Sequence, residues 1–264
     1  MSSNYDFEVH AYGCDIQVAT DSLETLAMLN RYILPSLPRS AGMVDWPDIH
    51  LRVDRAADRF QLQANNAHIA SADQASDLVT SLVQILDDAV IERLTTLRAL
   101  HAGVVQWKGR ALLLPGMSHA GKSSLVAELL RRGAIYFSDE YALVDARGCV
   151  HPYPRPLLLR NGHPEQHPML ADECDAPIGD APARVGWIMA LQYTPECSFR
   201  ITPVTQSEAV LTLLQNTPHV LPESPGLVDA FQRTVSEAAC YTGCRGEAAD
   251  AADEILRMID GASA

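Results

Sequence analysis

The segment Gly116-Met-Ser-His-Ala-Gly121-Lys122-Ser123 constrains this chain more than any other, because it satisfies the pattern G-x-x-x-x-G-K-[ST]. The glycines of the pattern permit backbone angles that turn successive N–H groups inward. Those groups, together with the N-terminus of a following helix, bind phosphate oxygens. An apolar run at 111–115 precedes the segment, and residues 122–132 follow it with helical spacing up to Gly133. This strand–loop–helix setting predicts a phosphate-binding loop, or P-loop, inside an α/β fold.

The pattern also predicts the ligands. ATP and Mg²⁺ are expected, with the lysine charge at the β- and γ-phosphates and the Ser123 hydroxyl on the metal. His119 occupies a variable position of the pattern, where the backbone does the binding, so its side chain is interpreted as tolerated. The residues expected to surround the nucleotide phosphates are Gly116, Met117, Ser118, His119, Ala120, Gly121, Lys122, Ser123 and Ser124.

Two carboxylates follow the next predicted strand, 134–137, in the sequence Ser138-Asp139-Glu140. Phosphoryl-transfer sites use acidic groups to hold the magnesium and to handle the proton of the nucleophile. Parallel strands end at the same edge of a sheet, so this pair should face the phosphates. Neighbouring side chains of a strand point to opposite faces, so both carboxylates can face the site only at the strand's end or in a turn. Asp139 is expected to accept a hydroxyl proton and Glu140 to reach the metal. Two acidic residues at an exposed strand end are the alternative.

The first part of the chain reads as strands joined by turns. Partly alternating apolar residues predict strands at 5–9 and 15–19 and a hairpin formed by 48–53 and 59–63. A loop is predicted at 35–42. Residues 75–100 carry apolar positions at helical spacing, which predicts one long amphipathic helix that covers the sheet or links two parts of the chain.

The second part alternates strands and helices. Strands are predicted at 101–107, 111–115, 142–145, 149–151, 186–193 and 199–203, and helices at 206–216, 227–239 and 248–259. The proline-rich segment 152–182 is predicted to be irregular, as a loop over the nucleotide or a peptide. We therefore expect a strand-rich N-terminal extension with its bridging helix at 1–98 and a P-loop domain at 99–264.

Charge and cysteine content limit the partners. The chain has 33 acidic and 20 basic residues, a net charge of −13, which repels nucleic acid and anionic membranes. No apolar run is long enough to span a bilayer, and the N-terminus has no secretion signal, so a cytoplasmic protein is expected.

The six cysteines form no Cys-x-x-Cys pair and are expected to be free thiols. A metal cluster is not expected, because no zinc spacing relates His151, His163, His167, Asp172, Glu173 and Cys174.

Several of these residues carry a family resemblance. His101-Ala-Gly103, the P-loop, Arg132-Gly133 and Ser138-Asp139-Glu140 resemble the catalytic domain of HPr kinase/phosphorylase. They resemble more closely its bacterial relatives, the HPr-kinase-like serine kinases, which include enzymes that phosphorylate lasso-peptide precursors. The stretch 152–160 is also similar to this group. The resemblance covers about 99–161 well and the C-terminal third loosely, and it implies an HPr-kinase-like, PEP-carboxykinase-like mixed sheet core.

The resemblance implies a role for each matching position. Asp139 would be the general base that activates a serine hydroxyl, and Glu140 stands where the family usually has a second, shorter aspartate. His101 would lie near the phosphates or the base, although a lone histidine at a strand start more often packs or hydrogen-bonds. Arg155 and Arg160 would stabilise the transferred phosphate, although an arginine between prolines is as often a packing or surface residue. Phosphorolysis and hexameric assembly do not follow from these motifs, and the residues leave a homo-oligomer open.

Three functions are therefore weighed. The leading one is an ATP- and Mg²⁺-dependent kinase that phosphorylates a serine or threonine hydroxyl on a peptide or small protein. The second is a nucleotide-binding regulatory or accessory module, which would lack an ordered base. The third is a small-molecule kinase, acting for example on a free amino acid, which would need a closed pocket.

Overall fold

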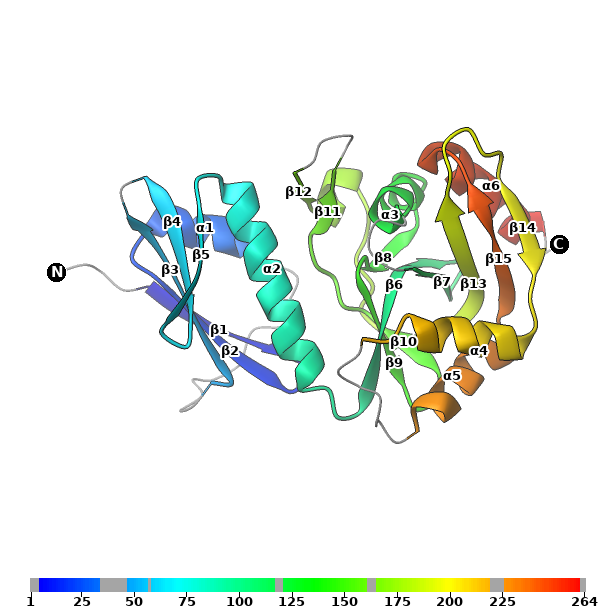
Figure 1. The fold of residues 1–264 in the computed structure, drawn as a ribbon, viewed down its shortest axis with the longest axis horizontal. Coiled ribbons are helices and arrows are strands. Elements are labelled where there is room, and N and C mark those ends of the chain that lie inside the picture. The colour runs from blue at the N-terminus through cyan, green and yellow to red at the C-terminus, as the bar shows by residue number, and fades with distance from the viewer. Residues whose placement is uncertain are drawn as a thin grey trace. The chain divides into compact units, whose positions relative to one another are not determined.

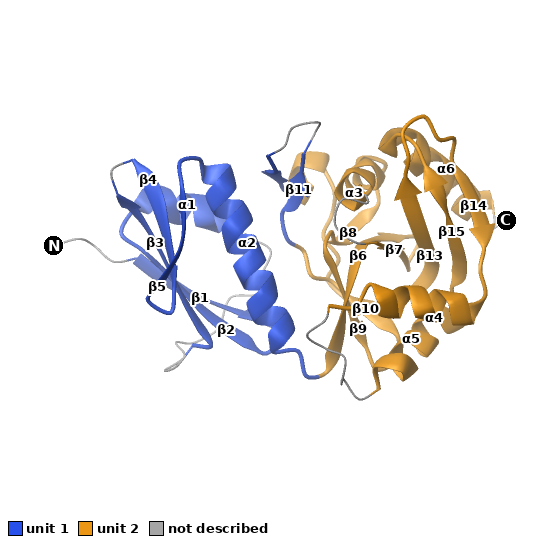
Figure 2. Ribbon diagram, in the orientation of Figure 1, with its two compact units in different colours: residues 1–95, 155–170 blue, residues 96–154, 171–264 orange. Residues whose placement is uncertain are grey.

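The computed structural model describes residues 5–33, 47–56, 58–116, 121–160, 165–218 and 226–261. The fold is mixed α/β and divides into two compact units (Figures 1 and 2). Unit 1 comprises Met1–Thr95 and Arg155–Leu170, and unit 2 comprises Thr96–Pro154 and Ala171–Ala264. Contacts thus group the segment 155–170 with the N-terminal unit, whereas the sequence pattern placed it in the second domain. The loop predicted at 35–42 lies outside the described residues.

Unit 1 is a five-stranded sheet with two helices. Its strands lie in chain order: β1 (Tyr5–Ala11), β2 (Cys14–Thr20), β3 (Ile49–Ala56), β4 (Arg59–Ala64) and β5 (Ala67–Ala72). Helix α1 (Leu23–Tyr32) connects β2 to β3, which are parallel, and all other neighbours are antiparallel. Helix α2 (Ala75–Glu92) packs on β4 and β5. The strands and hairpin predicted between residues 5 and 63 are confirmed, whereas α1 and β5 were not predicted.

The helix predicted for 75–100 was too long. Helix α2 ends at Glu92, where the cap residue Arg93 donates its N–H to Val90 O and Ile91 O. The strand β6 (Leu97–Trp107) then begins. Leu94 and Leu97 continue the helical spacing, but β6 is buried between other strands, and such strands carry nearly continuous apolar runs that periodicity cannot separate from a helix.

Unit 2 contains an eight-stranded mixed sheet. Its strands are β6, β7 (Arg110–Pro115), β8 (Ile135–Ser138), β9 (Tyr141–Asp145), β10 (Cys149–His151), β13 (Ala183–Tyr193), β14 (Arg200–Pro203) and β15 (Ala239–Arg245). Their order is β10-β9-β6-β7-β13-β15-β14, with β8 also paired to β6. Strands β7, β13 and β15 are parallel to one another. The first residues of β13 pair with β10 and the next ones with β7, so the sheet curls.

Helices cover both faces of this sheet (Figure 1). On one face, α3 (Lys122–Arg131) packs against β6 and against α6 (Ala248–Gly261). On the other face, α4 (Gln206–Gln215) and α5 (Leu227–Ser236) share a core with alternate sheet residues such as Leu100 and Val104. All four helices were predicted, with ends within three residues of those observed.

The segment predicted to be irregular, 152–182, contains short regular elements. Strands β11 (Leu157–Leu159) and β12 (His167–Met169) pair with each other, and a 3₁₀ helix spans Ala171–Cys174. The sequence did not reveal these elements, because they have three or four residues each and are too short to show a period.

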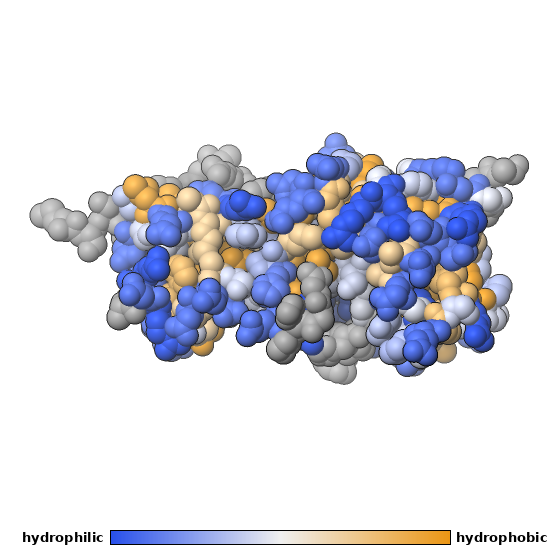
Figure 3. Space-filling model, turned by 90° about the horizontal axis from the view of Figure 1, so that it is seen from above, coloured by the Kyte–Doolittle hydropathy of each residue, from blue (hydrophilic) through white to orange (hydrophobic). Residues whose placement is uncertain are grey.

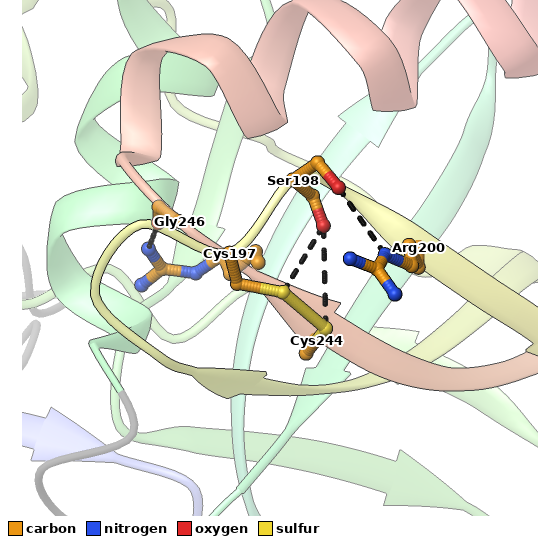
Figure 4. Close-up of a disulfide and its surroundings, with 6 residues drawn as sticks. Cys197, Ser198, Arg200, Cys244 and Gly246 are labelled. Carbon is orange, nitrogen blue, oxygen red and sulfur yellow. Dashed lines mark hydrogen bonds between the residues drawn. A yellow bond between two sulfur atoms is a disulfide. The ribbon is translucent and has the colours of Figure 1, made fainter.

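The structure corrects the expectation of free cysteines at two positions. Cys197 and Cys244 form a disulfide, while Cys14, Cys149, Cys174 and Cys240 are free (Figure 4). The two cysteines are far apart in sequence, and the pairing of β14 with β15 brings them together. For this reason, the spacing of the cysteines in the sequence could not have revealed this disulfide.

The face of the protein seen in Figure 3 is mostly hydrophilic. On the face seen in Figure 3, hydrophobic residues lie in small groups among hydrophilic ones. None of the helices in the described ranges is both long enough and apolar enough to cross a membrane.

Candidate functional site

The site lies at one edge of the unit 2 sheet. Strands β7 and β8 are both antiparallel to β6, so they run in the same direction as each other, and β13 and β15 are parallel to β7. The carboxyl ends of these four strands, Pro115, Ser138, Tyr193 and Arg245, therefore lie toward the same edge. Ligands of α/β sheets bind at this kind of edge.

The 116–123 motif and the acidic pair flank the same part of β6. On one side, Gly116 N–H donates to His101 O (3.2 Å), and on the other, Ala102 N–H donates to Glu140 O (3.0 Å). Asp139 and Glu140 form the break between β8 and β9, as their predicted position at a strand end requires. A register shift in β8 just before them adds one residue to that strand, and bulges of this kind re-aim the side chains that follow.

The side chains of three predicted residues, His101, Lys122 and Glu140, lie close together there. One Glu140 oxygen lies 3.3 Å from His101 Nδ1 and the other 3.8 Å from Lys122 Nζ. Asp139 is only 3% exposed and Lys122 only 8%. The His101 ring packs against Tyr141, with ring centroids 4.5 Å apart. Four residues predicted from sequence, His101, Lys122, Asp139 and Glu140, therefore lie at one edge, with Glu140 between the histidine and the lysine.

Gly121 and the two residues after it set the start of α3. Gly121 is the N-cap residue, with φ 74°, and no side chain caps the first N–H groups of the helix. Lys122 and Ser123 are the first two residues of α3. Met117, Ser118, His119 and Ala120, which were predicted to contact phosphates, lie outside the described residues.

An arginine that sequence reasoning missed contacts the motif. Arg245, at the end of β15, donates from Nη2 to Gly121 O (2.6 Å) and from Nη1 to Gly246 O (2.8 Å). It is 2% exposed, and burial lowers its pKa. Its guanidinium carbon lies 5.3 Å from the centre of the Tyr193 ring. No local sequence signal marks Arg245, because the pairing of β15 with β13 is what brings it to the motif.

The two arginines that were predicted for the site, Arg155 and Arg160, belong to unit 1. Arg155 is buried and forms an ion pair with Asp87 of α2, which is also buried. Arg160 is exposed. The structure therefore gives Arg155 a packing partner within its own unit, in agreement with the packing alternative stated for it from sequence.

The histidines considered for a metal cluster do not gather in the described residues. His151 lies 3.3 Å from Asp145 Oδ2 in the β9–β10 hairpin, and His167 belongs to β12 of unit 1. His163 lies outside the described residues. Among the residues that are described, no group of three or more His, Cys, Asp or Glu side chains could hold a metal ion.

The chemistry of this edge combines anion-binding groups with carboxylates. Lys122, the Arg245 guanidinium and the uncapped first N–H groups of α3 can attract and bind an anion. The Glu140 carboxylate and the Ser123 hydroxyl are oxygen ligands of the kind that Mg²⁺ takes alongside phosphate oxygens. These residues fit a magnesium-bound phosphate chain.

No protein-family model matches the chain, and no curated protein matches it in sequence. The functional argument therefore depends on the motif and on the geometry of this edge.

Proposed function

We propose that the protein is an ATP- and Mg²⁺-dependent kinase of the HPr-kinase-like, P-loop kind, which transfers the γ-phosphoryl group to a serine or threonine hydroxyl of a peptide or small protein. The observation that carries this proposal is the placement of Lys122, Asp139 and Glu140 at one edge of the sheet, where Glu140 contacts both Lys122 and His101 and Asp139 is buried. A P-loop that binds nucleotide needs only the lysine and the helix start. A buried carboxylate beside them favours chemistry over binding alone.

Each residue has a role that its position supports. Lys122 places its ammonium on the β- and γ-phosphates, and its burial strengthens that interaction. Ser123 and Glu140 would hold Mg²⁺, which supplies charge neutralisation to the transferring group. Asp139 accepts the proton of the acceptor hydroxyl. His101 contacts the Glu140 carboxylate and orients it.

The alternatives are a regulatory nucleotide-binding module and a kinase of free amino acids. A regulator has no use for an acceptor base, and Asp139 is retained at the edge where a base would be required. A kinase of a free amino acid would phosphorylate the free compound and leave peptides unmodified.

Asp139→Asn tests the proposal. This change keeps size and hydrogen-bonding capacity but removes the basicity needed to take a proton. Binding of a non-hydrolysable ATP analogue, measured by isothermal titration, should stay within about 3-fold of wild type. Phosphate transfer to a library of serine- and threonine-containing peptides should fall about 10²–10⁴-fold. Asp250→Asn is the control, because Asp250 is an exposed carboxylate of unit 2 at the start of α6.

The outcomes separate the candidates. Unchanged transfer in Asp139→Asn removes the base assignment. Weakened nucleotide binding that excess Mg²⁺ partly rescues would make Asp139 a metal ligand instead. A wild-type protein that binds the analogue but transfers phosphate neither to a peptide nor to free serine or threonine is a regulator. A wild-type protein that phosphorylates free serine or threonine but no peptide is a small-molecule kinase.

A further inference from the structure

Tyr193 is an aromatic residue at the functional edge that the proposed chemistry does not use. It ends β13, the strand next to β7, and is 40% exposed, although most large apolar side chains of unit 2 are buried. Its side chain is adjacent to the motif, since a Cβ built on Gly121 would lie 3.8 Å from Tyr193 Cβ.

The ring is held in a defined position. The Arg245 guanidinium lies over it at 5.3 Å from the ring centre, and the Tyr193 hydroxyl donates to Glu247 Oε1 (3.4 Å). Arg245 is fixed in turn by the carbonyls of Gly121 and Gly246. A guanidinium on one face of a tyrosine leaves the other face available for a flat ligand, at little entropic cost because the ring is already ordered.

The order of the strands determines which end of a nucleotide would meet this ring. Residues 139 and 140 lie beyond β6 on one side of β7, whereas β13 and β15 lie on the other side. A phosphate chain whose γ-phosphate is directed to the carboxylates, with its middle at Lys122, extends its other end toward β13. That end carries the nucleoside.

We infer that Tyr193, braced by Arg245, is the platform on which the purine base of the bound nucleotide stacks. This inference rests on the proposed nucleotide-binding function and adds a base subsite to it. Base–aromatic stacking is favourable for any base because every base has a π face, so Tyr193 contributes affinity. The Glu247 carboxylate beside the ring is the one acidic group that these contacts place next to the base, and it accepts hydrogen bonds from exocyclic amino groups.

The test compares ATP with inorganic tripolyphosphate, which has the phosphates but no base. Binding of each, with Mg²⁺, is measured by isothermal titration to the full chain. Tyr193→Leu keeps aliphatic bulk beside Gly121 but removes the π face, so ATP affinity should fall about 10-fold. The affinity of Tyr193→Leu for tripolyphosphate should stay within about 2-fold of the wild-type affinity. Tyr193→Phe keeps the ring and should bind ATP nearly as wild type does.

The two proposals fail in different ways. If wild type binds neither ATP nor tripolyphosphate, the nucleotide-binding function itself is wrong. If it binds both and Tyr193→Leu lowers neither affinity, or lowers both equally, the base subsite is wrong and the P-loop function stands. A melting curve for each variant shows whether it is folded, and Tyr193→Phe is the control for loss of the hydroxyl, because it keeps the ring.

Discussion

Two buried charged residues of unit 1, Arg155 and Asp87, bear on how the stretch 152–160 should be interpreted. Arg155 and Asp87 form an ion pair in which both side chains are at least nine-tenths buried, whereas Arg132 and Asp253 of unit 2 form a pair in which the aspartate is largely exposed. An exposed pair contributes little, because water screens both charges. Removing one partner of a buried pair leaves an uncompensated charge in a medium of low polarisability, which costs far more. Arg155 therefore ties the start of the 155–170 segment to α2.

Asp87→Leu should lower the free energy of unfolding by about 3–5 kcal/mol, because it leaves the Arg155 guanidinium buried without its carboxylate. The double variant Asp87→Leu/Arg155→Leu should recover most of that loss, since no charge remains buried. Chemical unfolding followed by circular dichroism measures both, with Asp88→Leu as the control at the exposed neighbouring position of α2. A double variant as unstable as the single one would show that the pair itself stabilises the fold.

At the scale of elements, the turn between β13 and β14 is attached to the strand that carries Arg245. Thr194 N–H donates to Arg245 O (2.9 Å), and Cys197 N–H donates to Thr194 O (3.1 Å). A Cβ on Gly246 would lie 2.4 Å from Cys197 O, so only glycine fits beneath the turn. The Cys197–Cys244 disulfide crosslinks the same two segments, next to the Ser198 carbonyl (Figure 4).

Thiol titration checks this crosslink. Unfolded, unreduced protein should show four reactive thiols and reduced protein six. In the native state the four free thiols should react slowly at pH 8, because burial raises their pKa values, that of Cys14 to about 11. The reaction of Cys14 should speed up as the pH rises toward about 11, where half of this thiol is ionised in the folded protein. Six thiols before reduction would show that Cys197 and Cys244 are not joined.

The same elements show what the sequence could and could not predict. The helix 122–131 and the three later helices follow from apolar periodicity. Helix α1 has ten residues, as α3 has, and was predictable as well, since Ser22 caps it and Leu29 packs beneath it. Lys122, Asp139, Glu140 and His101 could be identified because the motif and its following strand are local in sequence. Arg245 and Tyr193 could not, because their place beside Gly121 depends on parallel pairing between strands that are distant in the chain.

At the scale of the whole molecule, the chain passes between its two units three times, at 95/96, 154/155 and 170/171. The domain boundary expected near residue 98 lay close to the end of the helix predicted at 75–100. The return of 155–170 to unit 1 has no such signature, since it depends on contacts such as the Arg155–Asp87 pair. The residues of the candidate site, apart from Arg155 and Arg160, all belong to unit 2.

The central claim is that the 116–123 motif binds nucleotide through Lys122. Lys122 and Lys108 are the only lysines in the sequence, which gives a matched pair of substitutions within unit 2. Lys108 is half exposed and pairs with Asp260, away from the motif. Isothermal titration with Mg²⁺ and a non-hydrolysable ATP analogue should show binding by wild type and by Lys108→Ala. Lys122→Ala should lose binding, because no other lysine can supply the phosphate charge, and its melting curve should stay close to that of wild type. Full binding by a folded Lys122→Ala variant would contradict the account.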